Sequence, residues 1–250
     1  MRSLNENFSE RHFNWSLPPD DCDLSEEQVH VWVADLDQPE LIFKELARTL
    51  SLSEQERAAR FQFRQDRRNF ATARGFLRQI LSCHTKIPAN ELQFSYGQNG
   101  KPALVLPPGL PNFQFNLSHS GGLALYAVSK DRQLGIDLEK ISNCTDMDDV
   151  AARCFLPEEQ SALKFLEPQQ KAENFFRYWT RKEAQLKCSG EGFSSASEND
   201  LRFTRTLLEL EPAKGYMAAL AVCGKPFQLK TWQWQRERFS TKLASVCSLR

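Results

Sequence analysis

The stretch Gly135-Ile136-Asp137-Leu138-Glu139-Lys140 alternates apolar and polar side chains. This alternation predicts a β-strand, because successive side chains of a strand point to opposite faces of its sheet. Ile136 and Leu138 would face a core, and the carboxylates of Asp137 and Glu139 would share the other face. Two carboxylates held in this way suit Mg²⁺, which usually binds one or two of them and keeps water or phosphate at its remaining positions. The alternative is an ordinary amphipathic strand with a solvated face.

A second candidate cluster lies downstream, in residues 175–187, whose periodicity predicts a helix. Trp179, Glu183 and Lys187 are spaced four residues apart, so a ring, a carboxylate and an ammonium group would follow one another along a single stripe. Alternatively, Glu183 and Lys187 form only a stabilising surface pair, worth about 0.2–0.5 kcal/mol.

Two turns carry residues that could bind phosphate. Residues 116–122 read as a strand that enters a glycine-rich turn, where backbone amides, small hydroxyl groups and His119 could hold an anion. Neighbouring side chains of a strand point apart, which argues against a nucleophile and base pair within this motif. Residues 99–102 predict a hairpin turn that carries Lys101, which could reach a phosphate or simply be exposed.

The remaining pattern predicts an α+β fold. We expect a poorly ordered lead-in over residues 1–28, an N-terminal half over 29–131 and a C-terminal half over 132–250, with a ligand cleft between the halves. Ser53 is expected to begin a helix. Strands are expected at 29–34, 92–96, 103–106, 113–117, 124–129, 135–139, 201–204, 216–223 and 227–234, and helices at 53–63, 66–83, 157–166 and 170–188.

Composition narrows the class of protein. The 250 residues include 32 basic and 32 acidic side chains, so no net field favours a nucleic acid or an anionic membrane as the main partner. The seven cysteines are irregularly spaced and lack a CxxC pair, and we interpret them as reduced thiols. The sequence shows neither the apolar core of a secretory signal nor an apolar run long enough to cross a membrane. We therefore expect a cytoplasmic protein.

In this order, the motifs resemble those of the 4′-phosphopantetheinyl transferase superfamily. The family carries a strand similar to residues 135–139 and, further along, a helix similar to residues 179–187. The resemblance extends to Gly100-Lys101-Pro102, to residues 116–121 and to residues 190–192. Having both halves in one chain resembles the Sfp-like type. This implies a pseudo-dimer of two similar α/β halves, each a small, mostly antiparallel sheet packed with helices, acting as a monomer with its active site in the cleft between them.

The resemblance also implies a reaction. The phosphopantetheine arm of coenzyme A would pass to a serine of an acyl or peptidyl carrier protein, and adenosine 3′,5′-bisphosphate would leave. Asp137, Glu139 and Glu183 would hold Mg²⁺, or alternatively Mn²⁺. Glu183 would help to remove the serine proton, and Lys187 would neutralise the leaving group. Such a reaction needs positioning and charge neutralisation, without a covalent enzyme intermediate.

The residues implied to contact coenzyme A come mostly from the first half. They are Arg57, Lys101, Ser118, His119 and Lys187. Close to Arg57, the chain has Glu54 where relatives carry a lysine. Two other functions fit part of the pattern: a metal-dependent phosphohydrolase or nuclease, and a binding module for coenzyme A or carriers that has lost the reaction.

Overall fold

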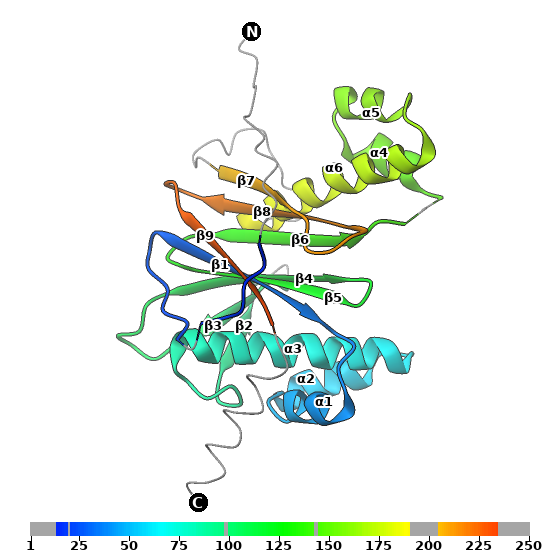
Figure 1. The fold of residues 1–250 in the computed structure, drawn as a ribbon. Coiled ribbons are helices and arrows are strands. Elements are labelled where there is room, and N and C mark those ends of the chain that lie inside the picture. Colours follow the sequence, from blue (N-terminus) through cyan, green and yellow to red (C-terminus); the bar gives the residue numbers. More distant parts are fainter. Residues whose placement is uncertain (1–13, 20, 98–99, 143–144, 191–204, 235–250) are drawn as a thin grey trace, which may run out of the picture.

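The structure is a computed structural model that describes residues 14–19, 21–97, 100–142, 145–190 and 205–234. Two β-sheets lie face to face in the middle, with helices covering the two outer faces (Figure 1). This arrangement confirms the predicted α+β class with small sheets packed by helices. No helix within these described ranges is both long and apolar enough to cross a membrane.

The first sheet has the strand order β4-β5-β1-β9. β4 (Phe113–Ser120), β5 (Leu123–Lys130) and β1 (Gln28–Asp35) form an antiparallel run, with Val31 opposite Ala127. β9 (Gln228–Gln233) is parallel to β1, so a strand from the end of the described chain joins the sheet of the first half. Both expected strand regions of residues 113–130 are present, and β4 continues three residues beyond the predicted end.

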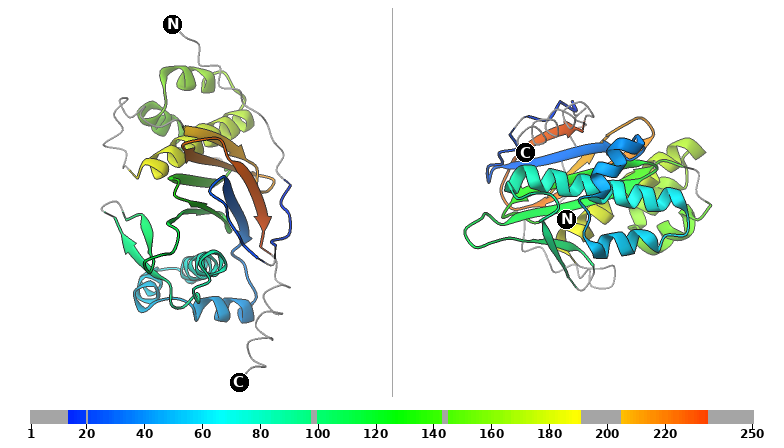
Figure 2. Two further views of the ribbon diagram at one scale, coloured as in Figure 1. Left: turned by 90° about the vertical axis from the view of Figure 1, so that its left-hand side faces the viewer. Right: turned by 90° about the horizontal axis from the view of Figure 1, so that it is seen from below.

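The second sheet is antiparallel and has the order β6-β8-β7. Its strands are β6 (Leu134–Lys140), β8 (Tyr216–Cys223) and β7 (Arg205–Leu210). The long helix α6 (Pro168–Ser189) covers its outer face, while α4 (Met147–Cys154) and α5 (Pro157–Leu163) pack near the beginning of α6 (Figure 2). The strand predicted at residues 201–204 lies outside the described residues.

Three helices lie on the outer side of the first sheet, where the longest packs against the sheet and the two shorter ones pack against the longest. They are α1 (Glu40–Ala47), α2 (Leu52–Ala59) and α3 (Arg64–Thr85), of which α1 was not predicted. α2 begins earlier than expected, because Ser51 rather than Ser53 is its N-cap and forms a capping box with Glu54. The predicted hairpin is confirmed as β2 (Gln93–Tyr96) and β3 (Pro102–Val105).

The strand alternation places apolar side chains in two separate cores. Ile136 and Leu138 are fully buried between the two sheets, where they pack with Val31 and Leu220. The opposite face of the first sheet packs against α3 around Phe76. Asp137 and Glu139 share the opposite face of β6, as the period of two predicted. This face is turned towards α6.

A buried ion cluster joins α2 to α3. The Glu54 carboxylate is only 3% exposed and accepts hydrogen bonds from Arg74 Nε at 2.8 Å and Arg78 Nε at 2.7 Å. Burial alone would raise the pKa of Glu54, but the two guanidinium groups and the Ser51 amide hold it below its ordinary value. Removing one partner would leave an uncompensated buried charge, so this cluster fixes how the two helices meet.

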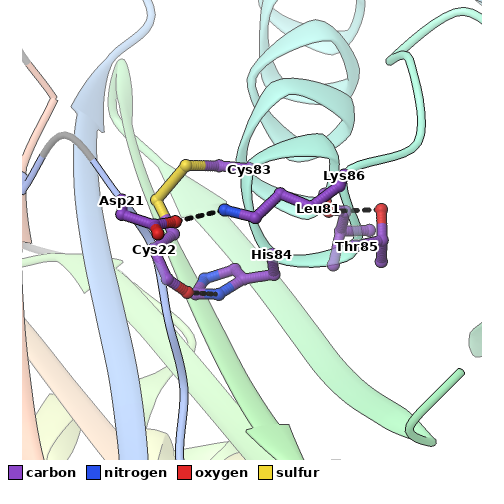
Figure 3. The surroundings of a disulfide bond; sticks show 7 residues. All are labelled: Asp21, Cys22, Leu81, Cys83, His84, Thr85 and Lys86. Atoms are coloured by element: carbon purple, nitrogen blue, oxygen red, sulfur yellow. Dashed lines mark hydrogen bonds and ion pairs between the residues drawn. A yellow bond between two sulfur atoms is a disulfide. The ribbon is translucent and has the colours of Figure 1, made fainter.

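The lead-in segment departs from two expectations. Cys22 and Leu24 are buried in the first core, although residues 1–28 were expected to lie outside it. Cys22 also forms a disulfide with Cys83 at the end of α3, so the reading of all cysteines as reduced was wrong (Figure 3). Sequence spacing could not reveal this pair, because 61 residues separate the two cysteines and only the fold brings them together.

Reduction of the Cys22–Cys83 disulfide should destabilise the protein. Closing a loop of this length in the unfolded chain is worth about 4 kcal/mol. We expect Cys22→Ser and Cys83→Ser to lower the midpoint of urea unfolding by similar amounts, and a reducing agent to have the same effect on the wild type. The double variant should be no less stable than either single one. A wild-type protein whose midpoint is unchanged by reduction would contradict the structural role.

Two buried histidines lie beside this disulfide. The rings of His30 on β1 and His84 on α3 are 5.3 Å apart, and His84 Nδ1 is 2.7 Å from the carbonyl oxygen of Cys22. Burial, reinforced by Lys230, lowers the pKa of His30 to about 4. Burial and the neighbouring His30 lower the pKa of His84 to about 3. Both imidazoles are therefore neutral in the folded protein at neutral pH.

These two histidines predict a loss of stability in mild acid. Both folded-state pKa values lie below the unfolded value of 6.5, so the unfolded chain binds protons first as the pH falls. The free energy of unfolding should be level above about pH 6.5 and should fall by about 2 kcal/mol per histidine between pH 7 and 4.5. Urea titrations of the wild type and of His84→Gln measure this, and equal pH slopes for the two would argue against it.

Candidate active site

The candidate site forms where α6 crosses β6. A Cβ atom on Gly135 would lie 2.2 Å from the Ala184 carbonyl oxygen and 2.4 Å from the Cys188 amide nitrogen. Only glycine therefore allows the helix backbone to rest directly on the strand. This close approach brings Glu183 and Lys187 of α6 next to the carboxylates of β6, although they follow Asp137 by almost 50 residues in the chain.

Lys187 and Asp137 form a close ion pair at the centre of the site. Lys187 Nζ lies 2.5 Å from Asp137 Oδ1 and 3.3 Å from the Ser118 hydroxyl oxygen. Ser118 in turn donates to Asp137 Oδ1 at 2.9 Å. Asp137 is only 3% exposed, and its Oδ2 atom is buried with no hydrogen-bond partner among the described residues. One oxygen of this carboxylate is thus committed, and the other is an unpaired acceptor that a cation would satisfy.

The other two carboxylates are electrostatically crowded. Burial raises the pKa of Glu139, and the Asp137 charge raises it further. Burial also raises the pKa of Glu183; Lys187 opposes this rise, whereas Asp137 and Glu139 add to it. The indole of Trp179 donates a hydrogen bond to Glu139, so the predicted stripe of Trp179, Glu183 and Lys187 does face the carboxylate pair. A bound cation would relieve this repulsion.

Strand β4 of the first half contributes a row of polar side chains. Asn116 Oδ1 accepts a hydrogen bond from the Ile136 amide at 2.8 Å, and Ser120 donates to Glu139 Oε2 at 2.8 Å. With Ser118, these residues occupy alternate positions and so share one face of β4. Sequence reasoning missed Asn116, Ser120 and Gly135 as site residues. The alternation of polar residues along β4 was the available signal.

His119 points away from that row but remains close to the site. Its ring is partly exposed, and burial of the rest together with the Lys187 ammonium group lowers the pKa of the imidazole. The ring is therefore neutral more readily than an ordinary histidine, and it can donate one hydrogen bond to an anion. The structure thus brings Ser118, His119 and Lys187 together.

Lys101 reaches the site from the β2–β3 hairpin, which stands beside the end of α6 (Figure 2). Its ammonium group donates to the Lys187 carbonyl at 2.5 Å and to the Leu134 carbonyl at 3.2 Å. A cation here complements the negative end of the helix dipole. Burial lowers the pKa of Lys101. Lys101 therefore lies beside the candidate site, but its ammonium group is bound to backbone carbonyls in this structure.

Arg57 lies apart from these groups. It lines a hollow of about 530 Å³ on α2, together with Tyr96, and its guanidinium group lies over the Phe70 ring at 5.3 Å. Within the described part of the chain, no hydrogen bond, ion pair or ring contact joins Arg57 to the carboxylates or to His119. Glu54, found where the resemblance leads us to expect a lysine, points into the buried ion cluster.

The three carboxylates are the type of ligand that a divalent ion prefers, but in this structure their side chains do not meet at one point. Among the described residues, no group of three or more His, Cys, Asp or Glu side chains is arranged to hold a metal ion. Lys187 instead occupies the position beside Asp137 Oδ1. The oxygen ligands, Asp137 Oδ2 without a partner among the described residues, and the mutual repulsion of the carboxylates all favour a divalent cation.

Comparison with known proteins gives matches along most of the chain. The family described as 4′-phosphopantetheinyl transferase superfamily matches residues 133–244, and the one described as 4′-phosphopantetheinyl transferase, N-terminal, matches residues 37–131. These two successive matches confirm the predicted two-halves architecture.

Individual relatives agree. The chain is 41% identical over 232 residues to 4′-phosphopantetheinyl transferase HetI of Nostoc sp. strain PCC 7120, covering 88% of this chain and 98% of that protein. It is 28% identical over 145 residues to 4′-phosphopantetheinyl transferase Sfp of Bacillus subtilis, covering 58% of this chain and 62% of Sfp. With these matches added to the site geometry, the chain belongs to the 4′-phosphopantetheinyl transferases of the Sfp-like type.

Proposed function

We propose that the protein transfers the 4′-phosphopantetheine arm of coenzyme A to a serine of an acyl or peptidyl carrier protein. Adenosine 3′,5′-bisphosphate is the other product. The observation that carries this proposal is the junction of β6 and α6, where Asp137, Glu139 and Glu183 converge with Lys187. Phosphoryl transfer requires mainly a positioned diphosphate, a base and neutralising charge, and this group of side chains supplies all three.

Asp137, Glu139 and Glu183 would hold the divalent ion, Mg²⁺ or alternatively Mn²⁺. When bound, the ion would neutralise charge on the diphosphate of coenzyme A. The unpaired Oδ2 atom of Asp137 supports this assignment, because a buried carboxylate oxygen without a donor is costly unless a ligand satisfies it. Lys187 Nζ would then leave Asp137 Oδ1 and turn to the phosphate that departs with the nucleotide.

Glu183 is the residue we assign as general base. It is half-buried on the side of α6 that faces Asp137, and its raised pKa makes it a better proton acceptor than an ordinary glutamate. It would take the proton of the carrier serine as that oxygen attacks the phosphorus next to pantetheine. No protein nucleophile takes part, so the acceptor oxygen comes from the partner protein.

Four further side chains would bind the nucleotide part of coenzyme A. Ser118 and His119 present a hydroxyl group and an imidazole beside Lys187, where the diphosphate would lie. Lys101 donates to the carbonyl of Lys187, two residues before the end of α6, and would exchange its backbone carbonyls for a phosphate. Arg57 faces a separate hollow, where it could meet the more distant 3′-phosphate. Lys187 completes the set on the diphosphate side.

The site is complete within one chain. Ser118 and Ser120 come from the first half, and the carboxylates from the second. A monomer therefore suffices for the reaction, and we propose that it works in the cytoplasm, where coenzyme A and carrier proteins meet. A disulfide such as Cys22–Cys83 is uncommon in a reducing compartment, so its stabilising role there depends on how far it is oxidised.

The first test is the mass of an apo carrier protein after incubation with the wild type, coenzyme A and Mg²⁺. We expect the carrier to gain one phosphopantetheine. Asp137→Asn should lower the initial rate by about 10²-fold or more, because one ligand of the ion and the partner of Lys187 are lost. Removal of divalent ions with EDTA should have a similar effect on the wild type.

The alternatives give different results in the same assay. Tight binding of coenzyme A without any gain in carrier mass would favour a binding module. Metal-dependent cleavage of simple phosphodiesters without a requirement for coenzyme A would favour a phosphohydrolase or nuclease. A wild-type rate for Asp137→Asn with an unchanged melting temperature would contradict the assigned metal site.

Lys187→Gln should reveal the dual role of this lysine. Loss of its ammonium group should lower kcat by about 10²-fold with a smaller change in KM for coenzyme A. It also leaves the buried Asp137 carboxylate unpaired, so the melting temperature should fall in the absence of metal. Mg²⁺ should then raise the melting temperature of Lys187→Gln more than that of the wild type.

Lys164→Gln is the matched control, because Lys164 is exposed and lies at the end of α5. It should behave as the wild type in both measurements. Equal stabilisation of Lys187→Gln and wild type by Mg²⁺ would show that the ion and the ammonium group do not serve the same carboxylate.

A further inference from the structure

The tip of the β4–β5 hairpin is docked against the second half of the protein. Ser120 and Leu123 are opposite one another, and the two residues between them, Gly121 and Gly122, have φ values of 56° and 91°. Positive φ at both positions is typical of the tight two-residue turn that continues the strand twist. The turn therefore holds the Ser120 backbone rigidly at the end of its strand.

The tip of this hairpin contacts residues of β6 and β8. A Cβ atom on Gly121 would lie 2.4 Å from Cδ of Lys140, and the Tyr216 hydroxyl group donates to the Gly121 carbonyl at 2.5 Å. The Lys140 amide also donates to the Ser120 hydroxyl oxygen at 3.2 Å. Ser120 is thus tied both to its own hairpin and to the strand that carries the metal-site carboxylates.

The Ser120 hydroxyl group can donate one hydrogen bond, and the Glu139 carboxylate accepts it. Its Oγ atom lies 2.8 Å from Glu139 Oε2, while the Lys140 amide occupies an acceptor position of the same oxygen. The Glu139 carboxylate is thus oriented by Ser120 at Oε2, and the Trp179 indole donates a second hydrogen bond to the same carboxylate. Ser118 orients Asp137 in the same way one step back along β4, so alternate serines orient alternate carboxylates.

We infer that Ser120 is a positioning residue that orients the Glu139 carboxylate for the divalent ion. This inference rests on the proposed function only in assigning Glu139 as a metal ligand. Groups that hydrogen-bond to a ligating carboxylate fix its orientation, and their removal typically weakens metal binding by about 10- to 100-fold. Ser120 belongs to the first half and Glu139 to the second. The orientation of this metal-binding carboxylate therefore depends on how the two halves pack against each other.

The test compares the wild type with Ser120→Ala, Ser120→Thr and Ser82→Ala. The threonine variant retains the hydroxyl group, and Ser82 is a half-buried serine on α3, away from the site. Mn²⁺ binding is measured by electron paramagnetic resonance in the presence of coenzyme A and without a carrier, so that no turnover occurs. The Mg²⁺ dependence of carrier modification and the melting temperature are measured on the same proteins.

For Ser120→Ala we expect the Kd for Mn²⁺ to rise by about tenfold or more. The Mg²⁺ concentration that gives half the maximal rate should rise to match, and saturating Mg²⁺ should recover most of the rate. Ser120→Thr should restore affinity towards the wild-type value, and Ser82→Ala should equal the wild type.

A lower melting temperature of Ser120→Ala with an unchanged Kd for Mn²⁺ would overturn the inference and leave Ser120 a purely structural contact. A wild type that binds no Mn²⁺ would overturn it together with the metal site. If the wild type binds Mn²⁺ but modifies no carrier, the proposed function fails, while the Kd comparison still decides the role of Ser120.

Discussion

The structure depends on how the edge of one sheet meets the edge of the other. β4 and β6 belong to different sheets, and they are joined by side chains rather than by a backbone ladder. Asn116 satisfies the Ile136 amide, which an exposed edge strand would leave unpaired. Ser118 and Ser120 continue the row onto Asp137 and Glu139. Because one row of contacts both joins the halves and orients the carboxylates, the interface and the site cannot be altered independently.

A second constraint acts from the other side of β6. The absence of a side chain at Gly135 lets α6 lie on the strand, and the small residues Ala184 and Ala219 pack in the same layer. This contact sets the height of Glu183 and Lys187 above the sheet. Lys187 then offsets the charge of buried Asp137, so the unliganded protein does not retain an isolated buried carboxylate. A divalent ion and a diphosphate together would replace that pairing with another of balanced charge.

The first half supports the site without containing its acids. Its outer helices are held by the Glu54–Arg74–Arg78 cluster and by the Cys22–Cys83 disulfide, both remote from the carboxylates. This rigid layer carries the first sheet, and from it the β2–β3 hairpin extends Lys101 to the end of α6. The two halves thus contribute different groups to the candidate site. The first half presents hydroxyl, imidazole and lysine side chains, and the second presents the three carboxylates.

Local pattern alone determined much of this protein. A period of two in β6 predicted that Asp137 and Glu139 share a face, and a period near four in α6 predicted the stripe that contains Glu183 and Lys187, because these periods follow from backbone geometry. Only the tertiary structure could decide which residues of other elements these side chains contact. The burial of Cys22 and its disulfide, the return of β9 to β1, the need for glycine at position 135 and the bond from Ser120 to Glu139 all join residues distant in the chain. Spacing along a sequence carries no measure of such distances, since they depend on how the sheets and helices pack.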